Sequence, residues 1–144
     1  MIEQMVQGRE LTVSVLGNEQ GELEALPLIE IAPADGVYDF EAKYARNDTV
    51  YTPNPDLADG IAAGMKENAL RLCKALGVKH LGRVDFILLP DGQWNLLEVN
   101  TMPGFTATSL MPMAAQAIGM EMPELCVHLV KCALSEYSSI CKSE

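Results

Sequence analysis

The sequence predicts an α+β fold with a largely antiparallel sheet packed by helices. Two kinds of segment support this: short stretches in which apolar and polar residues alternate, and longer stretches with apolar residues three to four positions apart. Their order is two strands, a helix, a hairpin, a loop and two helices, which favours antiparallel pairing over the alternating pattern of a parallel sheet. Apolar residues make up 49% of the 144 residues, enough to form a core.

The first strand is expected over residues 10–16, where ELTVSVL alternates, and the second over 26–31, LPLIEI. Gly17 and Asn18 mark the turn between them. Proline, aspartate and glycine predict a loop over 32–39. The charged segment 40–48 and the TPNPDL that follows are interpreted as a surface loop beside short extended pieces.

A helix is expected to begin at Asp56, a plausible N-cap, and to end before Gly77, which suits the C′ position. A hairpin follows, with strands over 83–89 and 94–100 around the strong turn signal Asp91-Gly92. The helix is indicated by apolar residues on one face, namely Leu57, Ile61, Met65, Ala69, Leu72 and Leu76.

Glycine and proline predict a loop over 100–108. A short helix is expected from about Ser109 to Ile118, stopped by Gly119. A last helix begins at Pro123, which suits a first helical position, and runs to about Tyr137. Residues 1–138 are therefore expected to form one unit, and residues 139–144 a frayed tail.

Charge and composition exclude several classes of function. The net charge of −10 and the pI near 4.5 argue against binding to nucleic acid or to anionic membranes. The sequence contains no long apolar run that would predict a transmembrane helix, and no basic leader that would predict a signal peptide. Four cysteines without a Cys-x-x-Cys pair, and only two histidines, favour reduced thiols in the cytoplasm over a zinc site.

The predicted hairpin carries the chemistry. A turn of two or four residues pairs Asp85 with Glu98 and Arg83 with Asn100, on one face of the sheet. Two opposed carboxylates repel each other, so a shared proton, a neighbouring cation or a metal must offset them. Oxygen ligands favour Mg²⁺ or Mn²⁺. The alternative is a solvated face with a chance Arg–Asp–Glu network. The opposite face should pack on the core through Val84, Phe86, Leu88, Leu97 and Val99.

Five segments together resemble the C-terminal part of D-alanine–D-alanine ligases, which are ATP-grasp carboxylate–amine ligases. The resemblance covers about residues 1–137 and implies the C-terminal subdomain of the ATP-grasp fold. The segments are GRELTV at 8–13, FEAKY at 40–44, GRVD at 82–85, LLEVNTMPG at 96–104 and SLMPMAA at 109–115.

The resemblance implies roles at matching positions. Asp85, Glu98 and Asn100 would bind two Mg²⁺ (or Mn²⁺) ions that bridge the ATP phosphates, with Glu98 shared. Arg83 would stabilise charge on the tetrahedral intermediate. Lys43 would reach the transferred γ-phosphate, although alone it is one of ten basic residues.

The remaining implied roles concern ATP and D-alanine. Glu3 and residues 4–6 (Gln4, Met5 and Val6) would form the hinge that bonds adenine, and Glu10 would bind the ribose; in an alternating strand Glu10 could equally face solvent. Tyr44 would lie in the loop over the site. Ser109 could bind the carboxylate of the second D-alanine, cap its helix, or both. The pocket for this D-alanine would comprise Gly104, Ser109 and Leu110.

The match begins at the adenine hinge, and the sequence has no glycine-rich phosphate loop. We therefore expect the C-terminal portion of a ligase, with the missing N-terminal half as its partner, ATP and D-alanine as substrates, and a homodimer for the complete enzyme. Isolated, the chain is expected to be inactive. The alternatives are another ATP-grasp ligase, including a D-Ala–D-Lac ligase, and a non-catalytic nucleotide-binding or interaction module.

Overall fold

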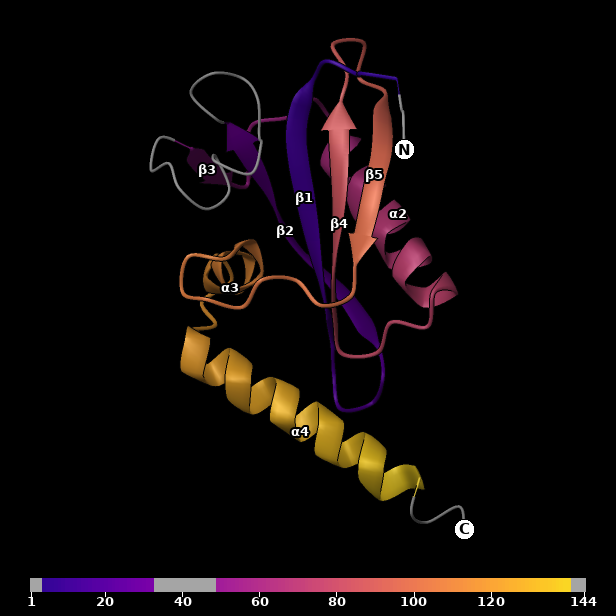
Figure 1. Cartoon of the computed structure of the whole chain (residues 1–144), viewed down its shortest axis with the longest axis vertical. Helices are drawn as coiled ribbons and strands as arrows, with labels where there is room; N and C mark the ends of the chain where they lie inside the picture. The colour runs from indigo at the N-terminus through magenta and orange to yellow at the C-terminus, as the bar shows by residue number, and fades with distance from the viewer. Residues whose placement is uncertain (1–3, 33–48, 141–144) are drawn as a thin grey trace.

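The computed structural model describes residues 4–32 and 49–140, and shows a five-stranded sheet with three helices (Figure 1). The strand order is β3-β2-β1-β4-β5, and each neighbouring pair is antiparallel. The predicted α+β class is confirmed. The elements are β1 (Arg9–Gly17), β2 (Leu23–Ala32), β3 (Val50–Pro53), α2 (Ile61–Ala75), β4 (Leu81–Leu88), β5 (Trp94–Asn100), α3 (Leu110–Gln116) and α4 (Met122–Ile140).

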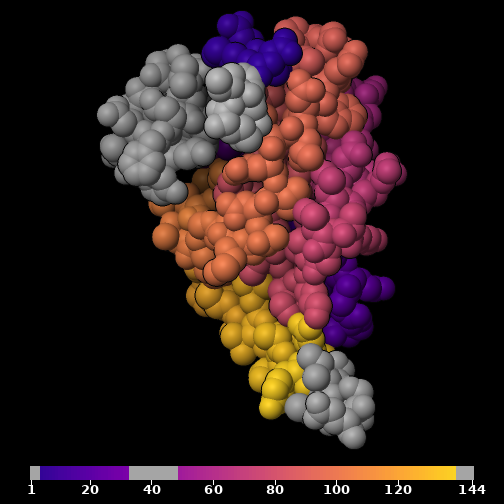
Figure 2. Space-filling view, turned by 45° about the vertical axis from the view of Figure 1, so that its right-hand side comes forward, coloured from indigo at the N-terminus to yellow at the C-terminus, as the bar shows by residue number. Residues whose placement is uncertain are grey.

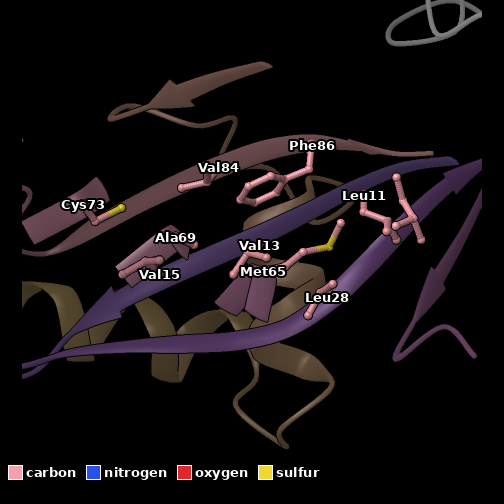
Figure 3. Packing of buried hydrophobic residues seen from close by; sticks show 10 residues of the cluster. Leu11, Val13, Val15, Leu28, Met65, Ala69, Cys73, Val84 and Phe86 are labelled. Atoms are coloured by element: carbon pink, nitrogen blue, oxygen red, sulfur yellow. The ribbon is translucent and has the colours of Figure 1, made fainter. Parts of the chain in front are cut away.

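Helix α2 covers one face of the sheet. The odd-numbered apolar residues of β1, Leu11, Val13 and Val15, point toward it and are almost completely buried (Figure 3). Met65 and Cys73 meet them from α2. The same alternation continues in β4, where each second residue is buried, so this layer is the main core of the domain.

Helices α3 and α4 pack against the opposite face. Their buried residues, among them Met111 and Leu125, belong to one apolar cluster with Ile29 and Ile31 of β2. The sheet contributes to this layer from β1 and β2, with Tyr51 of β3 and the first residue of β4 packed against it. Beyond Leu81, this face of β4 carries Arg83, Asp85 and Ile87, and the neighbouring end of β5 carries Glu98 and Asn100. The candidate site lies there, next to the α3 layer.

Helix α2 begins four residues later than predicted. Its N-cap is Gly60, in the left-handed conformation, rather than Asp56. The backbone oxygen of Asp56 instead accepts hydrogen bonds at 3.2 Å from the Arg9 guanidinium, which holds the chain outside the helix. Leu57 still packs on the core, so the apolar spacing was informative although the cap was misplaced. Gly77 has a φ of 70° and ends the helix as predicted.

The hairpin turn differs from the prediction. The Leu89 N–H donates to the Gln93 oxygen at 2.8 Å, which leaves a three-residue loop with Gly92 in the left-handed region, at a φ of 84°. An odd loop shifts the pairing by one residue. A β-bulge at Leu97 shifts it back, so that Asp85 again pairs with Glu98. Leu97 itself is 52% exposed, contrary to its predicted core position.

The remaining predictions hold with small changes. A short strand, β3, forms within the segment interpreted as a loop with extended pieces. Helix α3 follows Ser109 as expected, and α4 runs to Ile140, beyond the predicted end at Tyr137. Loops are predicted over 32–39 and 40–48; Ala32 ends β2 instead, and residues 33–48 lie outside the described residues, as do 141–144. No helix in the described part of the chain is long and apolar enough to cross a membrane.

Helix α4 is anchored to the sheet at Gly17, where β1 ends. The Gly17 oxygen lies 2.7 Å from Nε2 of His128, so this histidine has a structural role. A Cβ at Gly17 would lie 2.0 Å from the Lys79 oxygen, so only glycine fits there. His80 is half-buried, and its Nε2 lies 2.8 Å from a carboxylate oxygen of Glu136 on α4.

Candidate metal and nucleotide site

Four polar side chains meet on one face of the β4–β5 hairpin. Asp85 pairs with Glu98 and Arg83 with Asn100 across the two strands. Successive residues of a strand point to opposite faces, so 83 and 85 share a face, as do 98 and 100. The opposite face carries Val84, which is fully buried. The predicted juxtaposition of these four side chains is confirmed.

Asp85 is held by neighbours on both sides. Nε and Nη2 of Arg83 donate to its Oδ1 and Oδ2 at 2.9 and 2.7 Å. From β1, the Thr12 hydroxyl donates to Oδ1 at 2.6 Å. The Arg83 and Asp85 side chains are only 14% and 16% exposed, so this ion pair is shielded from water.

Glu98 has a different environment. Its side chain is 59% exposed, and its Oε1 lies 3.8 Å from Nη2 of Arg83. Arg83 therefore lies between the two opposed acids and offsets their repulsion. Of the alternatives that the sequence allowed, the neighbouring cation is therefore present: it is the Arg83 guanidinium, within the Arg–Asp–Glu network. Glu98 keeps oxygen lone pairs that face solvent and can bind a further cation.

The donor set fits a hard divalent cation. Asp85, Glu98 and Asn100 offer only oxygen, and Asn100 Oδ1 also accepts the Met102 N–H at 3.0 Å. In the described ranges, no three side chains among His, Cys, Asp and Glu cluster as metal ligands. A cation here would complete its coordination with water or with phosphate oxygens, as Mg²⁺ does in nucleotide sites.

Thr12 is a site residue that the sequence reasoning missed. It is 1% exposed, and it pairs with Asp85 in the β1–β4 ladder. Its place in an alternating strand, two residues after Glu10, puts it on the predicted site face. Only the knowledge that β1 lies beside β4, rather than beside β5, would have connected it to Asp85.

The predicted nucleotide residues are only partly described. Glu10 lies on the same face of β1 as Thr12 and pairs with Ile87 of β4. Residues 4–6 lead into β1 at the end where β4 finishes, and Met5 is 79% exposed there. The other predicted residues of this group, Glu3, Lys43 and Tyr44, lie outside the described residues.

The residues predicted to form the acceptor pocket, Gly104, Ser109 and Leu110, follow β5. Gly104 lies beside Ser109, since a Cβ on Gly104 would be 3.1 Å from the serine Oγ. Ser109 occupies the N-cap position of α3, but its Oγ accepts the Thr106 N–H at 3.0 Å and does not cap the helix. Leu110 is buried in the α3 layer, so its side chain does not line an open pocket.

Two surface hollows lie away from the hairpin ligands. One, between α2 and the strands β4 and β5, is lined by residues that include Arg71, Trp94 and Leu96. Figure 2 shows β5 and the loop after it at the surface beside α2. The other lies against α4 and includes Glu19 and His128. None of the four hairpin side chains lines either hollow, so the candidate site is an open sheet face on this chain.

Solved structures share this fold. The D-alanine–D-alanine ligase from Coxiella burnetii matches with a TM-score of 0.80 and 28% identity, over 97% of this chain and 36% of that chain. The ligase from Bacillus anthracis, in complex with ATP, matches with a TM-score of 0.72 and 26% identity, over 94% of this chain and 42% of that chain. The fold is therefore that of the C-terminal subdomain of ATP-grasp ligases.

Sequence comparison narrows the class to a family. The family model described as D-ala D-ala ligase C-terminus matches residues 1–131, and the chain belongs to this family. The D-alanine–D-alanine ligase of Bordetella petrii is 49% identical over 130 residues, which are 90% of this chain and 40% of the relative. That of Pelotomaculum thermopropionicum is 46% identical over 134 residues, 93% of this chain and 42% of the relative. The chain thus spans about two fifths of these relatives.

Proposed function

We propose that this chain is the metal- and nucleotide-binding portion of an enzyme that joins two D-alanine molecules at the expense of ATP. The observation that carries the proposal is the pairing of Asp85 with Glu98, beside Arg83 and Asn100, within a stretch that matches the ligase family. A Bacillus anthracis ligase with the same fold was solved with ATP. The product, D-alanyl-D-alanine, would serve the synthesis of peptidoglycan precursors in the cytoplasm.

Asp85, Glu98 and Asn100 are the proposed ligands of two Mg²⁺ or Mn²⁺ ions, with Glu98 shared. When bound, such ions offset the negative charge of the ATP phosphates. Glu98 suits the shared position because its carboxylate is exposed. Glu3 and residues 4–6 would bond adenine, Glu10 would bind the ribose, and Lys43 would reach the γ-phosphate.

The proposed reaction has two steps. A carboxylate oxygen of the first D-alanine attacks the γ-phosphorus of ATP, which forms an acyl phosphate and releases ADP. The amine of the second D-alanine attacks the acyl carbon, and phosphate leaves as the peptide bond forms. Before phosphate leaves, Arg83 would stabilise the negative oxygen of the tetrahedral intermediate. Tyr44, Gly104, Ser109 and the backbone of Leu110 would position the second D-alanine.

The acceptor could differ from D-alanine. The VanG D-Ala:D-Ser ligase of Enterococcus faecalis matches this chain with a TM-score of 0.70 and 28% identity, over 90% of this chain and 37% of that chain. The fold therefore accommodates more than one acceptor, and D-lactate or D-serine are the alternatives to compare. A non-catalytic nucleotide-binding module is the alternative of a different class.

The test is a hybrid enzyme. The 130 matched residues of the Bordetella petrii ligase are replaced by those of this chain, and ADP release is measured with D-alanine, D-serine or D-lactate. We expect D-alanine-dependent turnover. Glu98→Gln in the hybrid should lower kcat at least about a hundredfold, because a preorganised charge is lost. Glu24→Gln, at an exposed position of β2, is the matched control and should leave kcat unchanged.

Each outcome separates the alternatives. Turnover with D-serine or D-lactate but not D-alanine would move the proposal to another acceptor. A folded hybrid that binds MgATP without turning over any acceptor would favour the non-catalytic module. Near-wild-type kcat in Glu98→Gln at saturating Mg²⁺ would contradict the metal assignment.

A further inference from the structure

We propose that Thr12 is a positioning residue that fixes the Asp85 carboxylate in the orientation required of a metal ligand. The inference rests on the proposed function, because it needs Asp85 to bind the metal. The inference adds to the proposed site a residue from a different strand, β1, that is not itself a proposed metal ligand. The supporting evidence is the geometry of the contact between β1 and β4.

Thr12 is built into the centre of the sheet. β1 lies between β2 and β4, and Thr12 pairs with Ile29 on one side and Asp85 on the other. Its side chain is 1% exposed, so the hydroxyl cannot bond to bulk water. It donates to Asp85 Oδ1 at 2.6 Å; its other contact, to the Val84 oxygen, is longer at 3.4 Å. A β-branched side chain has few χ1 rotamers, so the donor is fixed in place.

The two residues that donate to Asp85 belong to different strands. Arg83, on β4, donates to Oδ1 through Nε and to Oδ2 through Nη2, and its Nη2 also lies 3.8 Å from Glu98. Thr12 holds Oδ1 from the β1 side. Arg83 also has a proposed second task at the tetrahedral intermediate. The Thr12 bond does not depend on where the guanidinium points, so it keeps Oδ1 toward β1 when Arg83 takes up that task.

Ser14 provides an internal comparison. It lies two residues along β1, on the same face, and pairs with Arg83. It is also 1% exposed, but its hydroxyl has no hydrogen-bond partner within the described ranges. Thr12→Val and Ser14→Ala therefore each remove one buried hydroxyl from the same strand face, and only the first removes a bond to a proposed metal ligand.

The experiment follows Mn²⁺ alone, without nucleotide, binding to the full 144-residue chain by NMR. Mn²⁺ broadens amide signals close to it, so the titration reports both location and affinity. We expect broadening centred on Asp85 and Glu98, and its loss in Glu98→Gln. Thr12→Val should need about tenfold more Mn²⁺, the lower end of what loss of a ligand's hydrogen-bond partner costs. Thr12→Ser, which keeps the hydroxyl, and Ser14→Ala should stay within about twofold of the wild type.

The outcomes are distinguishable. If wild type and Glu98→Gln behave as expected but Thr12→Val binds Mn²⁺ like the wild type, the role of Thr12 is overturned and the metal site stands. If the wild type shows no broadening at Asp85 and Glu98, both the metal site and this inference are overturned. The same spectra show whether each variant is folded. If Thr12→Val is not, Thr12→Ala removes the same hydroxyl without placing a methyl group against the carboxylate, and carries the same expectation.

Discussion

The two opposed acids of the hairpin are not equivalent residues. β4 has β1 on its other side, so Asp85 is shielded and receives donors from two strands. β5 is the edge strand, so Glu98 faces solvent and has only a 3.8 Å contact to Arg83 among its ion pairs in the described part of the chain. The sequence predicted that the two carboxylates would meet. It did not distinguish them, because exposure depends on strand order, which local patterns do not contain.

Ser109 is the residue at which an acceptor-binding role can be separated from a structural one. In the hybrid enzyme, Ser109→Ala should raise the KM for the second D-alanine several-fold and leave the KM for ATP nearly unchanged, because only a contact to the acceptor carboxylate is lost. Thr108→Ala, the loss of a nearby exposed hydroxyl, is the control. Equal increases in both KM values would show that the Ser109 bond to Thr106 merely orders the loop.

The Arg9–Glu30 pair should make stability depend on pH in the acid range. Two hydrogen bonds from Arg9, at 2.6 and 2.8 Å, lower the pKa of Glu30 below its ordinary value of 4.5. Such a pair stabilises the fold above that ordinary value, and the contribution is lost as the pH falls through the lowered pKa. Glu30→Gln should therefore lower Tm by about 2 °C near neutral pH and by less near pH 3. A constant difference across this range would contradict the assignment.

In the hairpin, Asp85 and Glu98 meet as predicted although the loop between their strands differs from the predicted one. The predicted loop had two or four residues, and the actual loop has three. The bulge at Leu97 restores the register, so Asp85 and Glu98 still meet. Apolar alternation and the Asp-Gly signal predict strands and a turn. A bulge depends on how both faces of the sheet pack, which local sequence patterns do not contain. Leu97 was therefore predicted to face the core, although it is exposed.

Helix α2 and strand β5 are coupled through Gly64. Alanine normally stabilises a helix interior by about 1 kcal/mol relative to glycine. At Gly64, however, a Cβ would lie 2.8 Å from Cη2 of Trp94, whose ring packs over this position. Gly64→Ala should therefore destabilise the chain by about 1 kcal/mol in denaturant unfolding. In a Trp94→Leu background the same change should be stabilising; stabilisation with Trp94 present would show that the ring moves aside.

The outer surface of the molecule carries exposed apolar side chains on β5 and α4. Leu96 and Leu97 are about half exposed on the edge strand, and Val130, Leu134 and Tyr137 are 58–67% exposed on α4. The sequence predicted the helix and the strand that carry them. It did not show which of their faces would lie outward, because that depends on which layer each element joins.

Because the proposed site is an open sheet face, we expect the isolated chain to bind nucleotide weakly and to have no ligase activity. Its proposed ligands lie on one surface, Glu98 is 59% exposed, and the net charge of −10 repels a free nucleotide. Ligation needs the phosphates and both amino acids held together, and effective molarity is lost when part of the enclosing wall is absent. We expect the purified 144-residue chain to fold, to bind MgATP with a Kd of about 1 mM or weaker, and to show no ligase activity. Calorimetry and phosphate release test this, with the hybrid enzyme as the positive control. Phosphate release that depends on D-alanine from the chain alone would contradict the proposal that it is one portion of a larger catalytic unit.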